Sequence, residues 1–507
     1  LFGKLYIGEN PTPERNSYLV IHLNFSCIST GLDDYQKGLD SHCNIMFGSC
    51  CNRYAHLLPP NTKEEMNKRE GAAEQLMFLC QACNEVNQKI YLFIDEYDNF
   101  TNSILANEEH LERYRKQTHG EGYLRKFFNA IKGAADTSLG RVFVTGVSPV
   151  TMDDLTSGFN IGTNYSLNSR FNDMTGFTEE EVREMLSYYA SVLPFKHSID
   201  ELIKMMKPWY DNYCFSEDSY GETTIYNSVM VLYFLDNYIE GNYKIPKNMV
   251  ESNVRIDYNK IRMLIRHDKE FTNDASIIQQ LITKGFATGH LVENFPAECI
   301  NDPDNFLSLL FYFGMVTIDG EYDGETKFII PNEVVRDQIY TYLLDTYKEN
   351  DLVYDTYAKR KLESQMAYHG NFKPYFENIA DSLKRYSSQR DKQKGEAFVH
   401  GFTLAMTSQN QFYRPISELD NDGGYADIFL APLCDSYKDM KDSYIIELKY
   451  CKSNSTDEQL KQLFAEASAQ ISRYADSDLV RELVKTTQLH KLVVIYQGAE
   501  MATCEEV

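Results

Sequence analysis

Two acidic residues near the end of the chain lie in segments that are otherwise apolar and rich in strand-forming residues. Asp427 lies in residues 425–430, and Glu447 lies with Lys449 in residues 444–450. Because side chains alternate between the two faces of a strand, Glu447 and Lys449 are predicted to share one face. Burying charged groups on such a strand is costly, so the pattern favours a functional reason for their presence.

These residue types could carry out phosphodiester hydrolysis. Two carboxylates that meet across paired strands can hold a hard divalent cation, Mg²⁺ or Mn²⁺. The cation and a lysine can together polarise a phosphate group and activate a water molecule. We therefore expect Asp427 and Glu447 to be metal ligands, with Lys449 stabilising the transition-state charge or positioning the water.

An alternative interpretation of Glu447 and Lys449 is an ordinary ion pair on a solvated edge strand. The neighbours of the pair, Ile445, Ile446 and Leu448, are all apolar. Strands buried on both faces read as nearly continuous apolar runs, so the sequence favours a buried position for the pair.

The order of these motifs resembles the PD-(D/E)xK nuclease superfamily. Asp427 corresponds to the metal-binding aspartate of that superfamily, and residues 447–449, Glu-Leu-Lys, correspond to its ExK element. Further along the chain, Gln470 and Tyr474 match a QxxxY helix signature found in one branch. The resemblance implies that these two side chains support the site from a facing helix.

The predicted elements follow the order that this resemblance requires. A helix is expected at 395–406, a second helix at 457–474 and a closing strand at 490–496, with the two acidic strands between the helices. The resemblance implies a restriction-endonuclease-like α/β domain, a DNA substrate, and Glu418 and Glu396 as weaker candidates for further metal ligands.

A second signal lies in the first third of the chain, where an apolar segment ends in Asp95 and Glu96. In P-loop ATPases an acidic pair at such a place helps to hold Mg²⁺ and polarises the attacking water. Strands expected at 17–26 and 141–148 alternate with helical segments, which indicates a parallel α/β sheet. Ligands bind at the carboxyl ends of such strands, where Asp95, Glu96 and Thr145 are expected.

The amino-acid sequence around these strands resembles one group of predicted AAA-type ATPases, in which a PD-(D/E)xK domain commonly follows. The matching phrases include FIDEYDNF, VFVTGVSPV, NYSLNSRFNDMTGFTEEEV and KPWYDNYCF, and the resemblance covers most of the chain. It implies ATP as a cofactor and Thr145 as a sensor of the γ-phosphate. Arg170, Arg183 and Arg336 are candidate sensors or arginine fingers, with ordinary surface arginines as the alternative.

The chain contains no G-x-x-x-x-G-K-[ST] loop, the element that cradles the phosphates of a nucleotide. Either the N-terminal part of the ATPase core lies upstream of Leu1, or the ATPase is degenerate. Retention of Asp95 and Glu96 favours the first interpretation. A chain that truly begins at Leu1 is expected to lack the central strand and to hydrolyse no nucleotide.

The middle of the chain is predicted to be mainly helical. Thr178 and Glu181 form a capping-box pattern that opens a helix, and helix-spaced apolar residues continue to about 384. We expect an ATPase core at 1–175, a helical lid and connector at 176–385, and a nuclease-like domain at 386–507.

Composition limits the classes of function. The 507 residues carry a formal net charge of −24, which argues against passive DNA binding. No run of about 18 apolar residues suggests a membrane span, and the 11 cysteines lack the spacing of a disulfide scaffold. We expect a cytoplasmic protein without a membrane partner, for which a homo-oligomer or a protein partner stays open.

The sequence therefore predicts an ATP-regulated, metal-dependent deoxyribonuclease. Two rival functions stay open. In the first, the nuclease fold is an inactive docking module and the ATPase is the switch, because Tyr425 stands where relatives often carry a basic residue. In the second, the protein is an ATP-driven signalling or remodelling protein that does not act on nucleic acid.

Overall fold

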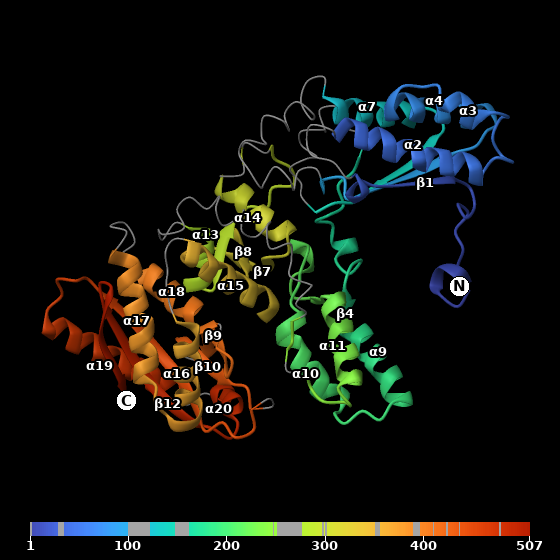
Figure 1. Ribbon diagram of the computed structural model, residues 1–507. Coiled ribbons are helices and arrows are strands. Elements are labelled where there is room, and N and C mark those ends of the chain that lie inside the picture. The colour runs from blue at the N-terminus through green and yellow to red at the C-terminus, as the bar shows by residue number, and fades with distance from the viewer. Residues whose placement is uncertain are drawn as a thin grey trace. The chain divides into compact units, whose positions relative to one another are not determined.

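The structure is a computed structural model that describes residues 3–28, 35–99, 122–147, 162–246, 248–250, 276–296, 299, 302–349, 355–388, 396–408, 410–421, 424–434, 437–475 and 478–507. The chain divides into two units. One unit consists of Leu1–Tyr165 and Leu291–Phe313, and the other consists of Ser166–His290 and Gly314–Val507 (Figure 1).

The first unit contains a parallel three-stranded sheet with the order β1-β2-β3. Its strands are β1 (Leu19–Asn24), β2 (Ile90–Asp95) and β3 (Leu139–Val144). Helices cover one face of the sheet in Figure 1, namely α2 (Tyr35–Arg53), α4 (Gly71–Glu85) and α7 (Tyr123–Ala135). Alternate residues of β1 and β2, such as Leu23 and Leu92, are completely buried. The predicted parallel α/β sheet is therefore present.

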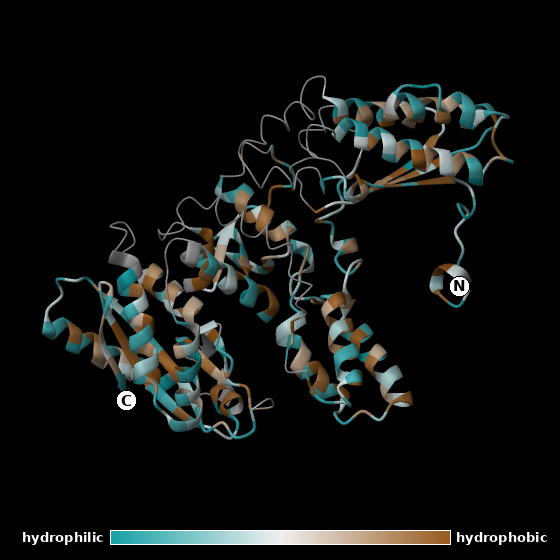
Figure 2. Cartoon of the chain, in the orientation of Figure 1, coloured by the Kyte–Doolittle hydropathy of each residue, from teal (hydrophilic) through white to brown (hydrophobic). Residues whose placement is uncertain are grey.

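The opposite face of this sheet carries side chains that remain accessible. Val20 and Phe143 are exposed, and an aromatic row joins Tyr91 to Phe93 at 4.2 Å and Phe93 to Phe143 at 6.1 Å between ring centroids. Figure 2 shows the strands as predominantly hydrophobic. Parallel sheets in α/β proteins usually have both faces covered, so the described part of this sheet has one face that is open.

The second unit begins with a bundle of three helices. They are α9 (Glu179–Val192), α10 (Ile199–Tyr210) and α11 (Ser228–Glu240), joined by the short paired strands β4 (Phe177–Thr178) and β5 (Ile225–Tyr226). The predicted capping box is confirmed, because the Thr178 side chain accepts from the backbone N–H of Glu181 and the Glu181 side chain accepts from that of Thr178. Leu186, Met206 and Phe234 contribute to the core of the bundle.

A small antiparallel sheet with the order β6-β8-β7 follows in this unit. Its strands are β6 (Phe286–Gly289), β7 (Thr317–Tyr322) and β8 (Glu325–Ile329). The helices next to it in sequence are α13 (Ile277–Thr283) and α15 (Glu333–Glu349). Asp323 and Gly324 both have positive φ and form the β7–β8 turn. Helix α14 (Pro303–Tyr312) lies in the first unit.

The C-terminal part of the second unit is a five-stranded mixed sheet with the order β13-β12-β11-β10-β9. The strands are β9 (Tyr413–Asn421), β10 (Gly424–Pro432), β11 (Asp442–Cys451), β12 (Gln488–Gln497) and β13 (Glu500–Glu506). The helices are α16 (Thr356–His369), α17 (Lys373–Ser388), α18 (Glu396–Ser408), α19 (Asp457–Tyr474) and α20 (Asp478–Val484).

The pairing of these strands follows from the lengths of their connections. β9, β10 and β11 are antiparallel neighbours, whereas β11 and β12 are parallel because α19 and α20 cross over between them. Helix α19 packs on β10, β11 and β12, and α18 packs on β9 and β11. Ile445, Ile446 and Val493 are completely buried, so β11 and β12 are covered on both faces. None of the helices that the structure describes is long and apolar enough to cross a membrane.

A buried histidine ties three strands together at one end of this sheet. His490 Nε2 lies 2.9 Å from Asp442 Oδ1, and His490 Nδ1 lies 2.8 Å from Glu506 Oε1. The ring stacks on Tyr444 with a centroid distance of 5.0 Å. Both ring nitrogens of His490 therefore lie within hydrogen-bond distance of a carboxylate oxygen. The starts of β11 and β12 and the end of β13 are joined in this way.

His490→Leu is expected to lower the free energy of unfolding by about 3 kcal/mol, because the substitution leaves the buried Asp442 carboxylate without its partner. Denaturant unfolding of the purified variant measures this change. His369→Leu, at an exposed position on α16, is the control and should change stability by less than about 0.5 kcal/mol. Equal effects of the two substitutions would show that the carboxylate contacts are not stabilising.

Candidate active site

Asp427 and Glu447 lie on neighbouring antiparallel strands. The strand register pairs Ile428 of β10 with Ile446 of β11, and the two acidic residues are the next positions along each strand. Asp427 Oδ2 accepts a hydrogen bond of 2.7 Å from the backbone N–H of Leu448. The sheet register therefore fixes the Asp427 carboxylate beside the strand that carries Glu447.

Glu447 is the buried member of this pair. The residue is 2% exposed, and Lys449 Nζ donates to its Oε1 at 2.7 Å. Its other carboxylate oxygen, Oε2, is buried and has no hydrogen-bond partner. Burial and the nearby Asp427 carboxylate raise the pKa of the Glu447 carboxyl to about 7, against the opposing effect of Lys449.

The facing helix contributes one further buried polar group. Gln470 lies on α19, which packs against β11, and its side-chain Oε1 is buried without a hydrogen-bond partner. Tyr474 is the last residue of α19, Glu418 belongs to β9 and Glu396 begins α18. The side chains of Tyr474, Glu418 and Glu396 lie outside the described part of the structure.

The residues present fit a hard divalent cation. A buried carboxylate oxygen without a partner is costly, and a cation would satisfy Glu447 Oε2 beside the Asp427 carboxylate. Oxygen ligands of this kind suit Mg²⁺ or Mn²⁺. Within the described ranges no group of three or more His, Cys, Asp or Glu side chains could hold a metal, so Asp427 and Glu447 are a pair that backbone oxygens or water would complete.

Three polar residues meet at the carboxyl ends of the strands in the first unit. Asp95 Oδ1 accepts a 2.6 Å hydrogen bond from Thr145 Oγ1 and a 3.1 Å bond from the backbone N–H of Glu96. Glu96 is exposed and has a φ of 52°, a conformation that is uncommon for a residue with a side chain. Asn24 of β1 lies opposite Asp95 in the sheet register.

The sequence analysis did not single out Asp98, which fixes the loops beyond β2 and β3. Asp98 is 1% exposed and its Oδ2 accepts from the backbone N–H of Val147 at 3.1 Å. A Cβ on Gly146 would lie 2.6 Å from Asp98 Oδ1 and 2.3 Å from the Tyr97 ring, so only glycine fits there. The signal in the sequence was a second aspartate three residues after the first.

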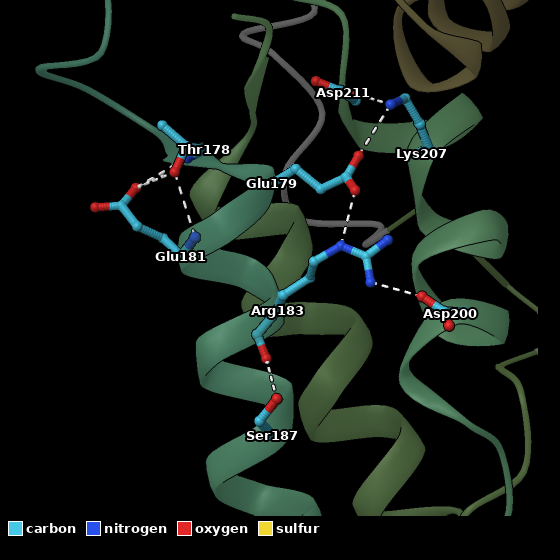
Figure 3. A network of polar contacts seen from close by, with 8 residues as sticks. All are labelled: Thr178, Glu179, Glu181, Arg183, Ser187, Asp200, Lys207 and Asp211. Atoms are coloured by element: carbon cyan, nitrogen blue, oxygen red, sulfur yellow. Dashed lines mark hydrogen bonds and ion pairs between the residues drawn. The ribbon is translucent and has the colours of Figure 1, made fainter.

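Arg183, one of the candidate phosphate sensors, already has two carboxylate partners. Figure 3 shows its guanidinium between Glu179, at 2.8 Å, and Asp200, at 2.6 Å. Glu179 also accepts from Lys207 at 2.9 Å, and the Lys207 ammonium lies 3.8 Å from the buried Asp211 carboxylate. The network joins α9 to α10, so Arg183 has a structural role in this arrangement.

The other two candidate arginines differ from Arg183 in their surroundings. Arg336 Nε lies 3.9 Å from Glu333 Oε1 within α15. Arg170 is exposed, and its backbone N–H donates to the Asn168 side chain. Both arginines belong to the second unit, whereas the strands that end near Asp95 and Thr145 belong to the first.

Stability of the metal-free protein is expected to fall as pH rises from about 4.5 to about 7. Over this window the folded state keeps a proton on Glu447 that the unfolded state has released from its carboxyl, whose ordinary pKa is 4.5. Glu447→Gln removes this titrating carboxyl. Between the two pH values the variant should therefore lose about 3 kcal/mol less unfolding free energy than the wild-type protein. Denaturant unfolding with a chelator present, at both ends of the window, measures it.

Glu466→Gln, at an exposed position on α19, is the matched control and should leave the pH dependence unchanged. If the Glu447→Gln and wild-type proteins lost the same stability as the pH rises, the raised pKa of the Glu447 carboxyl would be refuted.

Comparison with known families gives two matches. Residues 1–156 match the family model described as Predicted AAA-ATPase, and residues 394–506 match the model of the PD-(D/E)XK nuclease superfamily. No curated protein matches the chain. No solved structure matches it. The chain therefore joins an AAA-ATPase-like domain, at residues 1–156, to a domain of the PD-(D/E)XK nuclease superfamily, at residues 394–506.

Proposed function

We propose that this protein is a divalent-metal-dependent nuclease that hydrolyses DNA phosphodiester bonds under the control of ATP. The observation that carries the proposal is the environment of Glu447. A carboxylate with one buried oxygen unpartnered lies beside Asp427 and a lysine, which is a costly arrangement unless it holds a ligand. The nuclease-family match covers the same residues.

In this mechanism Asp427 and Glu447 hold Mg²⁺ or Mn²⁺, which polarises the phosphate and lowers the pKa of a water when bound. Glu447 gives up its proton to become a ligand. The Lys449 ammonium stays within the site and stabilises the negative charge that develops on the phosphate oxygens. Gln470, whose amide oxygen has no protein partner, accepts a hydrogen bond from the attacking water or the substrate. Water adds across one P–O bond, and the leaving oxygen receives a proton.

The charge of the protein favours controlled rather than passive binding of DNA. The net charge is −24, and acidic residues outnumber basic ones in residues 387–507 as well. Proteins bind DNA non-specifically by neutralising phosphates, and an acidic surface opposes that. In the proposal, access of DNA to the site therefore depends on the ATPase-like module or on a partner, with local positive charge from Lys449 and the bound metal.

In the ATPase-like module, Asp95 and Glu96 are proposed to hold the Mg²⁺ of ATP and to orient the attacking water, with Thr145 as the γ-phosphate sensor. The hydrogen bond from Thr145 to Asp95 supports a common site at the ends of β2 and β3. The open face around Phe93 and Phe143 supports the expectation that a further strand and helix, bearing a phosphate loop, complete the sheet.

The thiols agree with a reducing cytoplasm as the setting. All 11 cysteines are free in the structure, and most are buried. Burial raises the pKa of the Cys50 and Cys80 thiols to about 12. Such thiols are inert, apolar residues of the core.

Lys449→Ala should reduce cleavage of DNA at least about 100-fold, because it removes the positive charge next to the phosphate. The assay uses the protein expressed from its native reading frame with linear and circular DNA and Mg²⁺ or Mn²⁺. Asp427→Asn should also abolish metal binding, which calorimetry measures without reference to activity. Lys452→Ala, at an exposed lysine just beyond β11, is the control and should cleave normally.

Metal binding that survives Asp427→Asn, or cleavage that survives Lys449→Ala, would sink the proposed site. If Asp427→Asn loses metal binding but the wild-type protein cleaves no DNA, the domain would instead be an inactive docking module.

Addition of ATP should change the rate of DNA cleavage in the same assay, and Asp95→Asn should remove that change while ATP-independent cleavage persists. The reason is that Asp95 lies in the first unit and its carboxylate is a ligand of the nucleotide's metal in the proposal. Asp136→Asn, at an exposed aspartate after α7, is the control. An ATP response that Asp95→Asn leaves intact would contradict the assignment.

A further inference from the structure

The helical bundle of the second unit has apolar side chains on the outside as well as in its core. The inner faces of α9 and α11 contribute Leu186, Val231 and Phe234 to the core. On the outside, Tyr188 is 67% exposed and Leu232 is 50% exposed. Leu235 also belongs to the core, and Tyr189, Tyr233 and Ile239 pack against it. Core packing therefore leaves Tyr188, Val229 and Leu232 as the exposed apolar side chains of this surface.

The outer residues form a groove. Tyr189 of α9 and six residues of α11 line a hollow of about 430 Å³, and one of the six, Asp236, is the only charged residue among these lining residues. The other five α11 residues are apolar or aromatic, namely Val229, Leu232, Tyr233, Leu235 and Ile239. Val229, Leu232 and Asp236 are spaced at i, i+3 and i+7, which places them on one side of the helix. A groove of this pattern fits the apolar face of a helix.

The charges on the two helices restrict the chemistry of the partner. Arg183 is the single basic residue in α9 and α11, and Glu179 and Asp200 already bind its guanidinium. The acidic residues of the two helices are Glu179, Glu180, Glu181, Glu184, Asp236 and Glu240. An anionic surface disfavours nucleic acid and acidic lipid. A symmetric dimer through this face would place Asp236 and Glu240 against their own copies.

From this combination we infer that the α9–α11 groove is a docking site for a partner protein that presents an amphipathic helix with basic residues. Apolar side chains of the partner occupy the hollow around Leu232, and a lysine or arginine of the partner pairs with Asp236. The inference does not depend on the nuclease or ATPase activity, because no groove residue belongs to either site.

The test uses a short helical peptide with leucines at i, i+4 and i+7 and lysines beside them, labelled for fluorescence anisotropy. A second peptide carries glutamates in place of the lysines. The wild-type protein should bind the lysine peptide at least about tenfold more tightly than the glutamate peptide. Asp236→Lys should reverse this preference.

Leu232→Asp separates the groove from general charge attraction. It adds a negative charge, so binding through charge alone would become tighter, whereas loss of the apolar contact should weaken binding about tenfold. Ile45→Asp, at an exposed apolar residue of α2, is the control and should leave the affinity unchanged. Circular dichroism checks that each variant is folded.

Tighter binding by Leu232→Asp, or an unchanged preference in Asp236→Lys, would overturn the inference. Sedimentation analysis tests the alternative occupant. A dimer of the wild-type protein that Leu232→Asp dissociates would assign the groove to a second copy of this chain and would also overturn it.

Discussion

The cost of burying Glu447 between β-strands is the constraint on which the C-terminal domain depends. The carboxyl is 2% exposed and Lys449 satisfies one of its oxygens, while the other oxygen has no partner. Burial, together with repulsion from the nearby Asp427 carboxylate, raises the pKa of Glu447 to about 7. The apolar cover of β11 and β12 must outweigh this cost in the free protein. A ligand that pairs with both carboxylates would remove it.

Two acidic residues of β11, Asp442 and Glu447, differ in how the protein satisfies their charges. Asp442 is also buried, but His490 contacts it and in turn contacts Glu506. The charge of Asp442 is satisfied within the protein, and these contacts join three strands. Five positions further along the chain, the charge of Glu447 is incompletely satisfied. An acidic group left partly unsatisfied inside a well-packed sheet is what a metal-binding site requires.

Incomplete burial also characterises the first unit and the helical bundle. The parallel sheet exposes Phe143 on its open face, and the bundle exposes Leu232 in a groove that is also lined by Asp236. Exposed apolar surface of this kind marks contacts with other structure. The first surface suits completion of an ATPase core by a further strand and helix, and the second suits a basic helix of a partner.

Local sequence determined much of this protein. Apolar runs predicted β2 and β11, alternation placed Glu447 and Lys449 on one face, and Thr178 with Glu181 predicted the start of α9, because these signals lie within a few residues. The strands β9 and β13 were not predicted. β13 is a polar edge strand in which apolar and polar residues alternate only weakly.

Only the tertiary structure decided which acidic groups are satisfied. Asp427 meets the Leu448 N–H through strand register, and Asp442 meets His490 through a parallel pairing 48 residues away in sequence. It also decided that Arg183 binds Glu179 and Asp200. Contacts between distant segments depend on the packing of whole elements, and a sequence motif does not encode that packing locally.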